Sequence, residues 1–346
     1  MEATFILALF AHGYKVKTTT LFHLLKGKRT SSVLIYGFCY DCLRFIEAWP
    51  LVTENTYQQA INFLSAQGFL TYHLETKEGQ ITHRGQRYLL NHNFSLNTYA
   101  FINQYLFGKN TSEIWRMIQF CVQVVSNLSY DAKNYLPLES SPLYQQYLKH
   151  WLTLYSKDEL IHQVRQEWLQ LFRQLTNEES NYLAAQLTGH ECLGKTAQQL
   201  HKPGGTEFEK EMWQKNTLHH LLQVIMSESN PQPLYNLIQP LVAQNQNQSM
   251  QTTYSFLLAG LTPGEVAHQR KIKVSTVKDH LLELAIRRQI DSFYYVKNHT
   301  VRHSLTSSAS DPATWQFKKW QATIPNLDYL DFRLCQIGLL WKRRDK

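Results

Sequence analysis

The sequence contains few cysteines and no long apolar run. Its 5 cysteines among 346 residues follow no regular spacing, which argues against a secreted disulfide scaffold. Cys39 and Cys42 lack a second pair that would complete a tetrahedral zinc site, so we interpret them as two packed thiols. No apolar run approaches the roughly 20 residues that span a bilayer, and residues 4–11 lack the basic flank and cleavage site of a signal peptide. We therefore expect a cytoplasmic protein without a membrane span.

The common catalytic and metal-binding patterns are also missing. The sequence has no HExxH, GxSxG or DxDxDG segment, and its 15 histidines are scattered. No pair of carboxylates has a spacing suited to acid and base catalysis. These absences predict a protein without enzymatic activity, cofactor or bound metal.

One segment does match a catalytic pattern. Residues 189–196 fit the phosphate-binding loop G-x-x-x-x-G-K-[ST] in every fixed position. That loop requires a buried strand before it and a helix after it. Instead, a helix is expected from Thr176 onward, and only six residues separate Thr196 from Pro203. We interpret Gly189 as a helix C-cap and Thr196 as the start of a short helix, which makes an ATPase the least favoured function.

The charge of the chain is concentrated near one end. The formal net charge is +8 at pH 7; residues 250–346 hold 15 Lys and Arg against 8 Asp and Glu, while residues 1–249 hold 20 against 19. A basic surface of this kind is needed to neutralise DNA phosphates. A solvated basic surface without a partner is the alternative.

The basic end contains the pattern of a helix-turn-helix over residues 251–296. A short apolar helix ends at Gly260, which favours the left-handed cap. Thr262-Pro-Gly-Glu265 then forms a capping box with proline at the first helical position. A third helix is expected from Thr276, capped by Ser275, to about Arg288, with Val277, Leu281, Leu284 and Ala285 on its apolar face. Ala267 and Val277 provide the small and β-branched residues that a close crossing of the second and third helices requires.

These residues resemble known DNA-binding families. The stretches 260–270 and 274–281, with Arg270 and the Ile290-Asp291 pair, resemble the helicase-type helix-turn-helix at the ends of some RecQ-like helicases; they also resemble the LuxR-type motif of transcription factors. Recognition helices direct their first residues toward base edges. The resemblance thus implies base contacts and phosphate contacts from two groups of residues. The base group is Ser275, Thr276, Lys278 and His280, and the phosphate group is Arg270, Lys271, Lys273, Arg287 and Arg288.

The first third of the chain predicts three helices followed by a hairpin. Helices are expected over residues 18–26, from residue 32 to Glu47, and from Thr53 or Asn55; strands are expected over residues 69–74 and 81–85. This order is typical of a winged helix, with an unrelated small α+β module as the alternative. The block 25–32, together with the helix-turn-helix, resembles the bacterial YpbB family. That resemblance implies a role beside a RecQ-like helicase.

The sequence as a whole predicts a mainly α protein with three domains. A winged-helix-like domain with a small β-hairpin is expected over residues 1–95, a helical middle over 96–248, and the helix-turn-helix domain with C-terminal helices over 249–346. Tryptophans of the middle are expected to anchor its core, and the basic tail 342–346 either contacts phosphates or complements the last helix dipole.

The leading hypothesis is a non-enzymatic, nucleoid-associated protein that binds DNA and recruits or positions a RecQ-like helicase in repair or recombination. A transcription regulator and a protein-only adaptor are the alternatives.

Overall fold

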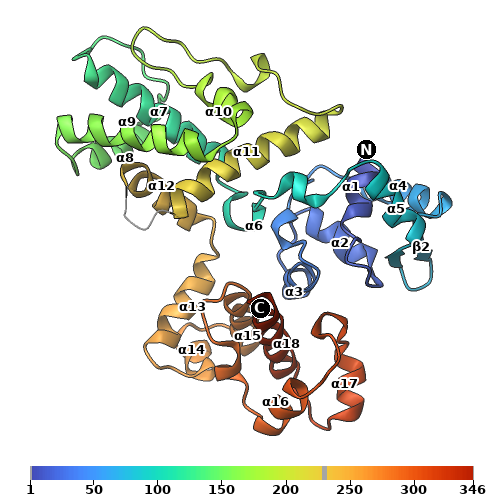
Figure 1. The fold of residues 1–346 in the computed structure, drawn as a ribbon. Coiled ribbons are helices and arrows are strands. Elements are labelled where there is room, and N and C mark those ends of the chain that lie inside the picture. Colours follow the sequence, from blue (N-terminus) through green and yellow to red (C-terminus); the bar gives the residue numbers. More distant parts are fainter. Residues whose placement is uncertain (1, 228–231, 346) are drawn as a thin grey trace. The chain divides into compact units, whose positions relative to one another are not determined.

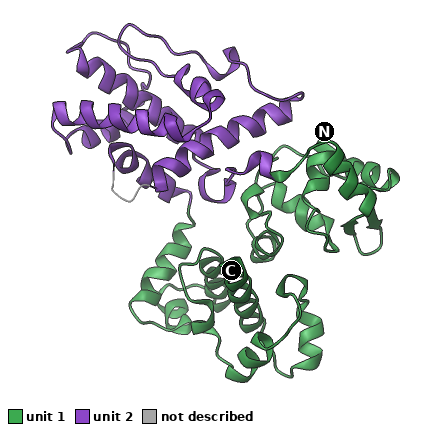
Figure 2. Ribbon diagram, viewed as in Figure 1, with its two compact units in different colours: residues 1–96, 246–346 green, residues 97–245 purple. Residues whose placement is uncertain are grey.

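The computed structural model describes residues 2–227 and 232–345 (Figure 1). They form two compact units (Figure 2). Unit 1 comprises residues 1–96 and 246–346, and unit 2 comprises residues 97–245. The predicted division into three domains stays a prediction, since one compact unit can contain two domains. The described residues are mainly helical, with one small sheet and a C-terminal helix-turn-helix, as the sequence predicts.

The first part of unit 1 contains the three predicted helices followed by a hairpin, with one helix and a short strand before them and one helix after them; the winged-helix assignment stays a prediction. Its elements are α1 Glu2–Ala8, β1 Val16–Lys17, α2 Thr18–Leu25, α3 Ser31–Cys39, the 3₁₀ turn η1 Leu43–Phe45, α4 Glu54–Ala66, β2 Leu70–His73, β3 Glu78–Ile81 and α5 His83–Asn91. The strands form an antiparallel sheet in the order β1-β3-β2, so β3 is central. The hairpin of β2 and β3 confirms the prediction of two strands after residue 68. Strand β1 was not predicted, because two residues are too short to show a strand pattern.

Two predicted boundaries in this part are wrong. The helix expected to reach Glu47 ends at Cys39, because Asp41 adopts a left-handed conformation with φ 53° and the chain continues as η1. The strand expected to reach Gly85 ends at Ile81, because the Thr82 hydroxyl accepts a hydrogen bond from the Gly85 amide at 3.0 Å and starts α5. A Cβ atom on Gly85 would lie 2.2 Å from the Phe69 carbonyl oxygen, so only glycine fits there.

Unit 2 is a bundle of helices around one apolar core. Its elements are η2 Leu96–Tyr99, α6 Gln104–Phe107, α7 Thr111–Ser129, α8 Pro142–Leu152, α9 Lys157–Gln174, α10 Asn177–Ala184, η3 Ala197–Gln199, α11 Glu207–Ser227 and α12 Pro233–Gln244. Trp115, Trp151 and Trp168 are buried in this core, and Trp213 packs against it. The prediction that these tryptophans are core anchors is confirmed.

Two buried histidines of α11 are held by hydrogen bonds in unit 2. The Asn103 amide donates to His219 Nδ1 at 2.9 Å, so Nε2 carries the proton and donates to Thr111 Oγ1 at 2.9 Å. Burial lowers the pKa of His219 to about 3. His220 Nδ1 lies 3.0 Å from Glu179 Oε2, and its ring stacks on Phe101. Both histidines therefore hold the fold together.

The last part of unit 1 is helical. It contains α13 Gln248–Leu258, α14 Pro263–Gln269, α15 Val274–Ile286, η4 Ser292–Tyr295, α16 His299–Thr306, η5 Pro312–Thr314, α17 Phe317–Thr323 and α18 Tyr329–Arg344. The long amphipathic helix α18 packs against α15 and α16. None of the described helices is both long enough and apolar enough to cross a bilayer.

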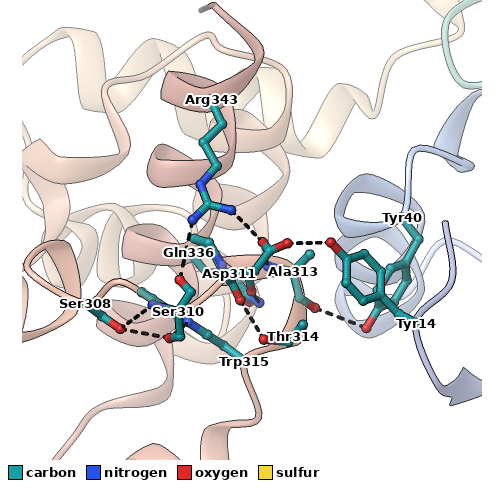
Figure 3. A network of polar contacts seen from close by, with 11 residues as sticks. Tyr14, Tyr40, Ser308, Ser310, Asp311, Ala313, Thr314, Trp315, Gln336 and Arg343 are labelled. Atoms are coloured by element: carbon teal, nitrogen blue, oxygen red, sulfur yellow. Dashed lines mark hydrogen bonds and ion pairs between the residues drawn. The ribbon is translucent and has the colours of Figure 1, made fainter.

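Polar contacts join the two ends of the chain within unit 1 (Figure 3). The Tyr14 hydroxyl donates to Asp311, which also pairs with Arg343 at 2.8 Å. The Tyr40 hydroxyl donates to the Ala313 carbonyl at 3.2 Å. Arg344 of the basic tail donates to the Phe38 carbonyl at 2.7 Å. Arg343 and Arg344 therefore bind protein groups; Lys346, the end of the tail, lies outside the described residues.

Candidate nucleic-acid interface

Helices α13, α14 and α15 form the predicted helix-turn-helix. Gly260 ends α13 with φ 88°. The Thr262 hydroxyl accepts from the Glu265 amide at 3.4 Å, and the Glu265 carboxylate accepts from the Thr262 amide at 2.7 Å, which confirms the capping box of α14. Lys271 turns the chain with φ 53°, and the crossing residues Ala267 and Val277 are both buried. The local chemistry of these residues thus builds the motif that the sequence predicts.

Helix α15 begins earlier than predicted and starts without a side-chain cap. Its N-cap is Lys273, in an extended conformation, and not Ser275. Because a lysine side chain has no acceptor, none of the described side chains caps the first-turn amides. Lys273, Val274 and Ser275 are exposed there. The Thr276 amide donates to the Lys273 carbonyl at 3.0 Å. The start of α15 therefore presents the amides of Val274 and Ser275, a cation and a hydroxyl at the surface.

The structure places five of the predicted contact residues around this helix start. Lys271, Lys273 and Ser275 are exposed, and Thr276 is half-buried. Lys278 lies one turn further and forms an ion pair of 3.0 Å with Asp328; the two side chains are 42% and 47% exposed. An exposed pair of this kind contributes little to stability, so Lys278 is free to exchange its partner for a phosphate.

Two predicted contact residues lie inside the protein instead. His280 is 6% exposed, and its Nδ1 lies 2.7 Å from Thr253 Oγ1. Burial and the nearby Arg270 lower the pKa of His280, which favours the neutral ring. The Arg287 side chain is 8% exposed and lies 3.7 Å from Glu283. Their outward placement was wrong because both continue the helical spacing of Val277 and Leu284, a signal that the sequence contained.

Arg270 and Arg288 contact protein groups at the edges of the motif. Arg270 donates hydrogen bonds to the Ser249 carbonyl at 2.8 Å and to the Thr253 hydroxyl. These two bonds connect the end of α14 to α13. Arg288 pairs with Asp345 and lies over the Trp341 ring, 4.9 Å from its centroid. These contacts give both arginines a structural role.

The N-terminal part of unit 1 adds basic residues that lie outside the predicted contact set. The Ser31 hydroxyl at the start of α3 donates to Asp279 of α15 at 2.6 Å, and α3 packs against α15. The loop before Ser31 carries Lys26 and Lys28, both exposed. The two stretches that resemble the YpbB family, at residues 25–32 and in the helix-turn-helix, therefore meet in the folded chain.

The phosphate-loop pattern in unit 2 has a different structure from a nucleotide site. Gly189 forms a bridge with Cys192 and is not the C-cap of α10, which is Ala185. Thr196 starts η3, as predicted. Six amides of the segment donate to protein acceptors, namely those of Gly189, His190, Cys192, Gly194, Lys195 and Thr196. These amides are not oriented as a cradle for phosphate.

The CxxC pair lies at the end of α3 and in the turn that follows it, where Cys39 is half-buried and Cys42 is buried. Cys39 and Cys42 are both free thiols. Burial raises the pKa of Cys39 to about 12 and that of Cys42 further. The thiols stay protonated at neutral pH, which fits their interpretation as packed side chains.

Comparisons with known proteins agree with this geometry. Residues 249–336 match a family model described as a helix-turn-helix domain. The chain is also 19% identical over 278 residues to Protein YpbB of Bacillus subtilis (strain 168), which covers 78% of this chain and 77% of that protein. No solved structure matches the chain. The C-terminal part of the chain is thus a helix-turn-helix domain, and most of the chain is distantly similar to YpbB.

Proposed function

We propose that this protein binds DNA through the start of α15 and acts as a non-enzymatic accessory of a RecQ-like helicase. The observation that carries the DNA part is the exposed, uncapped start of α15, flanked by Lys271 and Lys273, within a domain that matches a helix-turn-helix model.

The proposed binding mode divides the residues into two groups. Lys271, Lys273 and Lys278 contact phosphates, together with the amides of Val274 and Ser275, because helix starts attract anions. Ser275 and Thr276 face base edges, where their hydroxyls accept or donate hydrogen bonds. Lys26 and Lys28 extend the phosphate contacts beyond α15, because Ser31 holds their loop against Asp279. His280 and Arg287 support the helix from inside.

The helicase part of the proposal rests on similarity to the YpbB family. That resemblance extends over most of the chain. An accessory protein of this kind holds DNA and positions the helicase on it, in repair or recombination. A pull-down of RecQ-like helicase by the intact chain, in the presence of nuclease, tests the direct contact.

One observation favours a protein-only adaptor as the second candidate. Helix α3 packs along α15, so one flank of the recognition helix is covered by the protein itself. An adaptor would use the remaining surface for a protein partner and would show no salt-dependent DNA binding.

The test is fluorescence anisotropy of the full chain with blunt duplex, forked duplex and single-stranded DNA at two salt concentrations. We expect binding that weakens with salt, and a preference for the fork if the helicase proposal is correct. A K271E/K273E variant should bind at least about tenfold more weakly, with a salt slope smaller by about 2, because two phosphate contacts are lost.

A matched control is the K149E/K195E variant, which makes the same charge change at two exposed lysines of unit 2. It should keep the affinity within about twofold. Equal losses in both variants would indicate a general effect of net charge and would count against the interface. No binding to any of the three DNAs at low salt would refute the DNA proposal and favour the adaptor. Sequence-specific binding by a dimer would favour the transcription regulator.

A further inference from the structure

A cavity of about 340 Å³ lies between the two ends of the chain within unit 1. One wall comes from the β1 region and α3, with Lys15, Lys17 and Tyr36. The other comes from residues 313–316 and α18, with Arg333. Four side chains of Figure 3, Tyr40, Ala313, Trp315 and Gln336, belong to these walls. Its volume is at the lower end of the range for small-molecule sites, roughly 300 to 1,000 Å³.

The charged residues that line this cavity are mostly basic. Lys15 and Lys17 share one carboxylate, Glu78, at 3.5 and 3.6 Å. Arg333 pairs with no carboxylate among the described residues; its Nη1 donates to the Gln336 side-chain oxygen at 2.6 Å. Three cations therefore face one anion, which leaves an excess of two positive charges along the walls. An anion would balance this excess.

Two hydrogen-bonding groups in the walls have no partner among the described residues. They are the hydroxyl of Tyr36, a residue that is 8% exposed, and Nε of Arg333. A buried polar group without a partner is costly, so such groups mark places where a ligand or water binds. An Arg guanidinium recognises oxyanions through paired N–H donors. The hydroxyl of Ser32 also lines the cavity.

We infer that this cavity binds a small molecule through a phosphate or carboxylate group. The oxyanion accepts hydrogen bonds from Arg333 and, once the walls adjust around it, from Tyr36, while Lys15 and Lys17 balance its charge. Because the walls come from opposite ends of the chain, the ligand bridges the two parts of unit 1. Binding therefore stabilises their association. This site is separate from the DNA surface on α15 and does not depend on the proposed function.

The test is isothermal calorimetry and thermal unfolding of the full chain with potassium phosphate and potassium succinate, at constant ionic strength set with potassium chloride. We expect saturable binding of at least one probe, with a dissociation constant on the order of 1 mM. An increase of the unfolding temperature should accompany it. The probe that binds more tightly distinguishes a phosphate ligand from a carboxylate ligand.

The decisive variant is Arg333→Gln, which should weaken binding by about tenfold because one charge-assisted contact is lost. Arg343→Gln is its matched control: Arg343 lies on the same helix, pairs with Asp311 and does not line the cavity. The control should keep the affinity within about twofold. If Arg333→Gln does not fold, the exposed pair K15Q/K17Q provides the same test with little risk to the fold.

Equal stabilisation of the wild type, Arg333→Gln and K15Q/K17Q by phosphate would overturn the inference, because phosphate stabilises many proteins by exclusion from their surface. The absence of saturable binding by both probes would overturn it as well. Neither result would affect the DNA proposal, which K271E/K273E tests independently.

Discussion

The two compact units differ in how they use charged and polar side chains. Unit 1 holds 24 Lys and Arg against 14 Asp and Glu, whereas unit 2 holds 11 against 13. Unit 2 buries several polar groups in hydrogen-bond pairs, such as His219 with Thr111 and His220 with Glu179. Unit 1 keeps cations such as Lys271 and Lys273 exposed. The comparison indicates that polar groups specify the fold in unit 2 and provide a binding surface in unit 1.

The largest expected effect on stability comes from a buried histidine of unit 2. His219→Ala leaves the Asn103 amide without its acceptor, removes the hydrogen bond between His219 and the Thr111 hydroxyl, and opens a cavity in the core. The Thr111 hydroxyl keeps its bond to the Phe107 carbonyl at 2.9 Å. We expect a loss of about 3 kcal/mol in the free energy of unfolding. Hydrogen exchange, followed peptide by peptide, measures this loss in the intact chain and separates the two units.

The matched variant in unit 1 is His280→Ala. His280 has one hydrogen bond, to Thr253, and is half a turn from the surface residue Lys278. We expect the free energy of unfolding to fall by about 1 to 2 kcal/mol. DNA binding should weaken as well, because α15 loses a contact that holds it against α13. Similar losses of unfolding free energy in His219→Ala and His280→Ala would show that buried polar groups contribute equally to the stability of both units.

A pH dependence sharpens the comparison further. The pKa of His219 is about 3 in the folded chain and close to 6.5 when exposed. Between these values the unfolded state binds the proton and the folded state does not, so stability falls as the pH falls below 6.5. The slope is about 1.4 kcal/mol per pH unit, which gives about 2 kcal/mol at pH 5.

The control for this pH effect is His219→Gln, which removes the titrating group. Hydrogen exchange of unit 2 at pH 7 and pH 5, corrected for the intrinsic exchange rates, measures the difference. An unchanged slope in His219→Gln would show that other groups cause the acid sensitivity. In unit 1, burial also lowers the pKa of His12 to about 4. Peptides around His12 should therefore lose protection from hydrogen exchange at pH 5, and His219→Gln should not change that loss.

The sequence predicted several features set by neighbouring residues and missed those set by distant ones. The capping box of Thr262 and Glu265, the left-handed Gly260 and the cap at Thr53 depend on a few adjacent residues, and all are present. The contact of Ser31 with Asp279 joins residues 248 positions apart, and no local pattern encodes it. The cavity at Arg333 depends on such a meeting of chain ends. Local chemistry thus determined the helices of the candidate site, and packing determined which of its cations stay exposed.

The contrast between the starts of α14 and α15 gives a smaller effect. Thr262→Ala removes the cap of α14 and should cost about 1 kcal/mol. Lys273→Ala at the N-cap of α15 removes no capping bond and should change stability by less than about 0.5 kcal/mol. Thermal unfolding measures both, and anisotropy should show the reverse order, with DNA binding weakened mainly by Lys273→Ala. A weaker DNA affinity in Thr262→Ala alone would place the interface on α14.

The smallest effect is expected where the sequence most resembles a nucleotide site. Lys195 of the phosphate-loop pattern is exposed, and its amide donates to the Ala185 carbonyl at 2.7 Å. Lys195→Ala keeps that backbone bond, so stability should change by less than about 0.5 kcal/mol. The wild type should show no ATP binding that depends on this lysine, as measured by calorimetry with magnesium and ATP. Tight ATP binding lost in Lys195→Ala would refute this expectation, and unit 2 would then have a ligand-binding role that its charge and buried polar pairs do not indicate.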